Sequence, residues 1–145
     1  MQYLNNKHIT SKLFSKEFAD FCVNNEIRLA VLFGSQVSGE TREDSDFDIA
    51  ILIDKSSYPQ ASIEIGKLKR KLIRELSLFF ETSKIDLVLL NRASPLLKFQ
   101  VARTGKVIYQ KNRSEFADFA SLSLRQHIDA RLFYQLDEIY LKNNI

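Results

Sequence analysis

Two short polar motifs, each joined to a hydrophobic run, constrain the fold of this chain more than any other feature. Hydrophobic residues 27–33 lead into Gly34 and Ser35, ten residues follow, and Asp46, Phe47 and Asp48 then lead into hydrophobic residues 49–53. Alternate residues of a β-strand lie on the same face, so Asp46 and Asp48 point one way while Phe47 points into the core. The pattern predicts a strand, a Gly-Ser turn and a second strand that begins with two carboxylates.

These residue types suit the binding of a metal-bound nucleotide triphosphate. Two neighbouring carboxylates raise each other's pKa unless a cation lies between them. Mg²⁺ binds carboxylate and phosphate oxygens, and two ions roughly 3.5–4 Å apart can hold both oxygens of an in-line phosphoryl displacement. Gly34 lets the backbone approach a phosphate, and Ser35 adds a hydroxyl at a predicted helix start, where N–H groups favour an anion. Either motif alone is equally typical of a helix cap or a surface turn, but the two at this spacing favour nucleotide chemistry.

A third carboxylate, Asp86, is the only acid in the apolar run 85–90, which is typical of a buried strand. Such a carboxylate is costly unless it is paired or metal-bound. On its own it would be interpreted as a strand-end aspartate that faces water. Because a pair of acids occurs elsewhere in the chain, we expect Asp86 to be a metal ligand or a general base of the same site.

These motifs resemble the nucleotidyltransferase superfamily typified by DNA polymerase beta, and within it the minimal nucleotidyltransferase domains that include the MntA antitoxins. Residues 34–48 resemble the superfamily signature at its usual spacing, and residues 85–91 resemble its third-acid strand. Residues 94–97 and 103–109 resemble the segment that follows, and residues 128–131 resemble a Tyr-Leu-Asp stretch of the closing helix. The resemblance covers nearly the whole chain.

The resemblance implies transfer of AMP from ATP to an acceptor hydroxyl, with release of pyrophosphate. Asp46, Asp48 and Asp86 would hold two Mg²⁺ ions, Asp86 would also take the acceptor proton, and Gly34 and Ser35 would bind the β- and γ-phosphates. The implied acceptor is a tyrosine of a HEPN-family RNase toxin, which would make this chain the antitoxin of a pair.

Two alternatives stay open for the acceptor. One is transfer to a small molecule, as in aminoglycoside nucleotidyltransferases, which usually carry an additional helical domain. The other is a binding module that masks a toxin by contact and turns over no nucleotide. Gln36 and Ser38 stand where many minimal members carry arginine, and they keep the masking alternative open.

The length fits one domain over residues 1–145. The predicted elements together with the resemblance imply an α/β, polymerase-beta-like nucleotidyltransferase fold, with a small mixed β-sheet flanked by helices and a long C-terminal helix. The single cysteine, Cys22, excludes an internal disulfide and is expected in the core. The sequence has no signal peptide and no segment long enough to span a membrane, so we expect a cytoplasmic protein. The net charge of +3 does not indicate direct nucleic-acid binding, and the basic face of Lys67, Arg70, Lys71 and Arg74 is interpreted as solvated.

Periodicity predicts helices over 11–25, 59–81, 95–103 and 114–142, and strands over 27–33, 47–53, 85–90 and 107–109, with a short helix from Ser35 and a polar loop over 40–45. The last helix carries a stripe of Leu124, Ile128, Leu132, Leu136 and Ile139, with further aromatic residues beside it. Either this face docks on a partner, or the helix uses both sides as core. His127 is expected to pack rather than to bind a metal.

Overall fold

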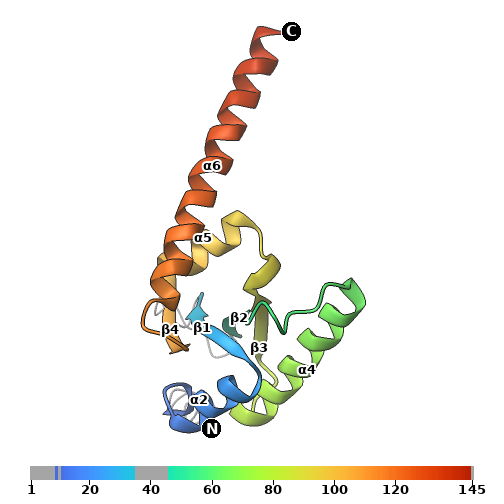
Figure 1. The fold of residues 1–145 in the computed structure, drawn as a ribbon, viewed down its shortest axis with the longest axis vertical. Helices are drawn as coiled ribbons and strands as arrows, with labels where there is room; N and C mark the ends of the chain where they lie inside the picture. Colours follow the sequence, from blue (N-terminus) through green and yellow to red (C-terminus); the bar gives the residue numbers. More distant parts are fainter. Residues whose placement is uncertain (1–8, 10, 35–45, 145) are drawn as a thin grey trace.

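The computed structural model describes residues 9, 11–34 and 46–144 of the chain. Within them a four-stranded sheet runs in the order β3-β2-β1-β4 (Figure 1). The strands are β1 (Ile27–Phe33), β2 (Phe47–Ile53), β3 (Ile85–Leu89) and β4 (Lys106–Gln110). β1 pairs antiparallel with β2 and with β4, whereas β2 and β3 are parallel. The parallel pair needs a crossover, which α4 (Ser62–Phe80) supplies, and the predicted mixed α/β fold is confirmed.

Helices cover both faces of the sheet. On one face α2 (Lys16–Asn24) and α4 pack on β1, β2 and β3 through a core that includes Phe18, Cys22, Leu72 and Phe80. On the other face α5 (Pro95–Thr104) and α6 (Glu115–Asn143) contribute Val101 and Phe119 to a smaller core. A 3₁₀ turn, η1 (Leu90–Arg92), links β3 to α5. Cys22 is fully buried, as predicted.

Strand alternation places the acids on the α5/α6 face. Ile49 and Ile51 belong to the core under α2 and α4, whereas Ala50 belongs to the core under α5 and α6. Asp48 is two residues before Ala50, so it shares the face of Ala50. By the same rule Asp86, which lies between the buried Ile85 and Leu87, faces that side of the sheet.

Most predicted elements are confirmed, and two helix starts were wrong. The helix predicted over 11–25 is interrupted: residues 11–13 are helical, but α2 begins anew at Lys16, because the Ser15 side chain accepts a hydrogen bond from the Phe18 N–H and caps a second helix there. The helix predicted from 59 begins at Ser62. Asp54 accepts backbone hydrogen bonds from residues 56, 57 and 58 and closes a turn there instead.

The last helix, α6, extends far from the sheet (Figure 1). Phe119 and Ser123 near its start are buried, but every residue from 131 to 144 is exposed. The interpretation in which α6 uses both sides as core was therefore wrong. His127 stacks on Phe99 with ring centroids 3.9 Å apart, which confirms that it packs. Among the described residues, no helix combines the length and apolar content needed to cross a bilayer.

Candidate active site

The three predicted acids meet at one end of the sheet. Asp48 and Asp86 are direct partners in the parallel pairing of β2 with β3, and Phe33 of β1 pairs with Asp48 from the other side. Asp46 is exposed and comes immediately before β2, while Phe47 between the two aspartates is 4% exposed. We call this end of the sheet, formed by Gly34, Asp46, Asp48 and Asp86, the acid-bearing end.

The carboxylate of Asp48 lies close to two other carboxylates, those of Asp86 and Asp46. Its pKa is raised from 3.8 to about 6, first by burial and then by the negative charge of Asp86 and a hydrogen bond with Asp86. The charge of Asp46 raises the pKa of Asp48 further. The free site is therefore strained near neutral pH, and a divalent cation between these oxygens would relieve the repulsion.

The donor set fits a hard cation such as Mg²⁺, because all three side chains offer carboxylate oxygens. Among the residues that the structure describes, no group of three or more acidic, histidine or cysteine side chains is placed to hold a metal ion together. The acids form a neighbouring pair, Asp48 and Asp86, with Asp46 flanking it. A hard cation takes six or more oxygen ligands, so one held by this pair would also bind phosphate oxygens.

Position 34 requires glycine for two reasons, the backbone conformation there and the closeness of Asp48. Its φ of +79° lies in the left-handed region, which residues with a side chain adopt with strain. A Cβ at this position would press on Oδ2 of Asp48 and lie 3.1 Å from its Cγ. The backbone thus passes directly over the Asp48 carboxylate, where a bound phosphate can approach both. The predicted roles of Ser35, Gln36 and Ser38, the short helix and the loop over 40–45 lie outside the described residues.

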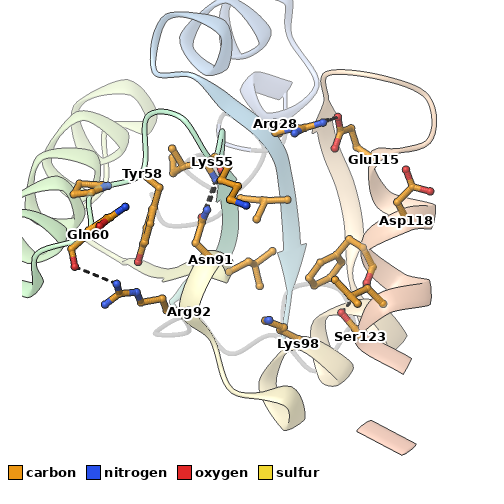
Figure 2. Close-up of a pocket in the computed structure, with 16 residues that line it drawn as sticks. Arg28, Lys55, Tyr58, Gln60, Asn91, Arg92, Lys98, Glu115, Asp118 and Ser123 are labelled. Atoms are coloured by element: carbon orange, nitrogen blue, oxygen red, sulfur yellow. Dashed lines mark hydrogen bonds and ion pairs between the residues drawn. The ribbon is translucent and has the colours of Figure 1, made fainter. Parts of the chain in front are cut away.

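A cavity lies at the opposite end of the sheet from the acids. It measures about 600 Å³ and lies between β1, the loop after β2, η1 and the first turns of α6 (Figure 2). Several of its polar groups already have partners. Arg28 Nη2 donates to Glu115 Oε1 at 2.7 Å, Asn91 exchanges two hydrogen bonds of 2.9 Å with the Ile53 backbone, and Arg92 donates to the Gln60 carbonyl. These contacts tie α6 to β1 and η1 to β2, which is a structural role.

Sequence reasoning did not find this cavity. Arg28 and Glu115 are 87 residues apart, and neither stands in a motif. An arginine inside an apolar strand was the only available signal, because such a charge needs a partner somewhere in the fold.

Comparison with known proteins places the chain in a family. The family model described as polymerase beta, nucleotidyltransferase matches residues 16–114, which include the acid-bearing end. The chain belongs to this family. It is 34% identical over 100 residues to the protein adenylyltransferase MntA of Aphanizomenon flos-aquae, a match that covers 64% of this chain and 63% of that protein. It is 32% identical over 116 residues to the protein adenylyltransferase MntA of Shewanella oneidensis, covering 79% of this chain and 77% of that protein.

Solved structures agree with the sequence matches. A chain from a toxin–antitoxin crystal structure with AMP-PNP superimposes with a TM-score of 0.59 at 28% identity, covering 86% of this chain and 96% of that chain. The second similar structure is of a tri-AMPylated Shewanella oneidensis HEPN toxin in complex with an MNT antitoxin. One of its chains gives a TM-score of 0.52 at 28% identity and covers 97% of this chain and 99% of that chain. The matched segment spans less than two thirds of the Aphanizomenon protein.

Proposed function

We propose that this chain is a protein adenylyltransferase that transfers AMP from ATP to a tyrosine of a HEPN-family toxin. The observation that carries the proposal is the register of β2 and β3, which sets Asp48 directly beside Asp86, next to Gly34. In a protein of the polymerase beta nucleotidyltransferase family, this is the arrangement that nucleotide transfer needs.

Each residue of the acid-bearing end has a distinct role in this proposal. Asp46, Asp48 and Asp86 would hold two Mg²⁺ ions, which supply neutralisation of the phosphate charge when bound. Gly34 gives the triphosphate access to the backbone, and Ser35 adds a hydroxyl for the β- and γ-phosphates. Asp86 is exposed and so can also face the acceptor. Catalysis of this kind depends mainly on position and charge.

The reaction itself is a single displacement. The acceptor oxygen forms a bond to the α-phosphorus of ATP while the bond from that phosphorus to its bridging oxygen breaks, and pyrophosphate leaves. The acceptor proton passes to Asp86. A tyrosine hydroxyl needs such a base because its pKa is about 10, so little of it is ionised at neutral pH.

The choice of acceptor rests on the relatives. Both curated relatives are named protein adenylyltransferases, and one similar solved complex contains a toxin that carries three AMP groups. The two rivals are a small-molecule acceptor and a module that masks the toxin without catalysis. We propose that the activity takes place in the cytoplasm, where ATP and Mg²⁺ are available. The one cysteine of the chain is buried and free, so the fold does not depend on a disulfide.

The test uses the chain and the protein encoded beside it, which the proposal expects to be a HEPN-family toxin. The purified pair is incubated with ATP and Mg²⁺, and the toxin is weighed by intact-mass spectrometry. We expect the toxin to gain the mass of one or more AMP units, and the gain to be lost in Asp86→Asn. The matched control is Asp20→Asn, an exposed acid on α2 at the other face of the sheet, which should transfer AMP normally.

Three other outcomes would contradict the proposal. A toxin that stays unmodified but inactive in a tight complex would support masking. A toxin that stays unmodified while an aminoglycoside is adenylylated would support small-molecule transfer. Full activity in Asp86→Asn would place the chemistry elsewhere in the chain.

A further inference from the structure

α6 has two faces with apolar side chains, and only one of them packs against the rest of the domain. Phe119, Ser123, His127 and Ala130, spaced four, four and three residues apart, are buried or partly buried on the side that packs against the domain. The α6 stripe, defined as Leu124, Ile128, Leu132, Leu136 and Ile139, lies on the opposite side of the helix by the same spacing. Its side chains are between 48% and 58% exposed.

The overhang of α6 does not explain this exposure. Leu124 and Ile128 lie where α6 still packs on α5, one residue from the buried Ser123 and from His127, which stacks on Phe99. They are nevertheless half exposed because they point away from the domain. No shift of α6 onto its own domain can bury both faces at once, so an outside surface must cover the stripe. Residues 131–143, all exposed, form a helix end of a length that is marginal in water without a packing partner.

The α6 stripe lies outside the segment that matches the family model, but within the part of the chain that superimposes on a similar solved structure. The nucleotidyltransferase match ends at residue 114, one residue before α6 begins. The chain from the HEPN toxin complex nevertheless covers 97% of this chain, which takes in most of α6. A helix that the family module does not include, and that a toxin-bound relative shares, points to the toxin as the occupant rather than a second copy.

The direction of α6 connects this surface to the active site. Glu115 at the start of α6 bonds to Arg28 at the start of β1, and α6 then runs the way that β1 points (Figures 1 and 2). β1 ends at Gly34, in the acid-bearing end of the sheet. The free half of α6, residues 131–143, therefore extends from the sheet in the direction in which β1 runs towards Gly34. A partner that lies along the stripe is brought towards the acid-bearing end.

We infer that the α6 stripe is the docking face for the toxin and that it sets where the acceptor tyrosine meets the acid-bearing end. The inference rests on the proposed function for the identity of the partner. The matching surface on the toxin is an apolar helical face, because the stripe is a line of aliphatic side chains at helical spacing. Arg125, Asp129 and Lys142 beside the stripe add up to a charge of only +1, so we expect this contact to depend little on salt.

The test compares two double variants of the free half of α6. Leu132→Asp with Leu136→Asp places two charges in the stripe. Tyr134→Asp with Leu141→Asp places two charges on the other side, where the side chains are 70% and 51% exposed. All four positions are exposed, so both variants should fold, and unchanged ATP binding by calorimetry checks this. Affinity for the HEPN-family protein encoded beside the chain is measured by calorimetry, and transfer by intact mass.

We expect the stripe variant to lose about 100-fold or more in toxin affinity, as for charges placed in the centre of an interface, while the control variant stays within about threefold of wild type. Transfer at low toxin concentration should fall with affinity. If both variants bind the toxin as wild type does, the inference is overturned although AMP transfer still stands. If sedimentation shows a wild-type dimer that only the stripe variant loses, with toxin binding unchanged, the stripe belongs to a second copy. Stripe-dependent binding without any AMP transfer would instead refute the proposed function and leave the docking face in place.

Discussion

Replacing Asp48 by asparagine should stabilise the metal-free protein at neutral pH. In the folded chain the pKa of Asp48 is raised from 3.8 to about 6, chiefly by burial and by the charge of Asp86. Between these two values the folded state holds a proton that the unfolded state has lost. Stability from this group is therefore full below about pH 4 and is lost as the pH rises through about 6. Asparagine has the same shape and does not ionise, so it escapes this loss.

The magnitude follows from the same values. The full rise of the pKa from 3.8 to about 6 corresponds to a free energy of about 3 kcal/mol. Asp48 is only partly buried, and water screens its interaction with Asp86 and Asp46, so we expect about 1–2 kcal/mol. Asp48→Asn should thus exceed the wild type by this amount at pH 7 and match it near pH 4.

The assay is urea unfolding in EDTA at a series of pH values from 4 to 8, with Asp20→Asn as the control for removal of one exposed carboxylate. Excess Mg²⁺ and ATP should then reverse the order, because they stabilise the wild type and not the variant. An Asp48→Asn protein that is less stable than wild type at pH 7 in EDTA would refute the reasoning. It would mean that the carboxylate is a structural partner rather than a strained one.

Three further perturbations have definite expected results. Gly34→Ala should cost about 1–2 kcal/mol in denaturant unfolding because of its left-handed backbone, and should abolish AMP transfer because the new Cβ displaces the Asp48 carboxylate; normal transfer would contradict this. ATP binding measured by calorimetry should disappear in EDTA, since residues 34–48 contain five acids and no lysine to neutralise phosphate; equal binding without metal would contradict a metal site. Arg28→Met should lower the free energy of unfolding by about 1–3 kcal/mol, because it leaves the buried Glu115 carboxylate with Asn112 as its remaining side-chain partner. An unchanged free energy of unfolding would show that the ion pair is dispensable.

Local patterns in the sequence predicted the elements that have clear local boundaries. β1 and β2 were placed at their observed bounds, because each is an apolar run that ends at a glycine or begins after an acid. α5 was placed because Ser94 caps it and Pro95 occupies its first turn. The start of α2 was missed because apolar periodicity runs on through Ser15, which one capping hydrogen bond turns into a boundary.

The site was predictable only in part, because local patterns do not show which strands pair or in which register. Asp46, Asp48 and Asp86 could each be picked out from their strands, but the parallel register that makes Asp48 and Asp86 direct neighbours depends on the α4 crossover. The pairing of Arg28 with Glu115 is also non-local, and no sequence pattern marks it. For α6 the sequence showed more apolar surface than one face can bury, and only the fold showed which side is left open.

The position of α6 also bears on how a protein acceptor would be held at the proposed site. A tyrosine hydroxyl reacts well only when it is held close to the α-phosphorus in the right orientation, and such positioning can account for about 7–11 kcal/mol of a barrier. The module over residues 16–114 offers the acids and the phosphate turn. In its described part, it has no further domain that could hold a large acceptor. We infer that α6, which starts beside Arg28 at the far end of the sheet and extends beyond the module, provides this positioning. On this view a chain shortened before Leu132 should still bind ATP but should lose transfer to the toxin.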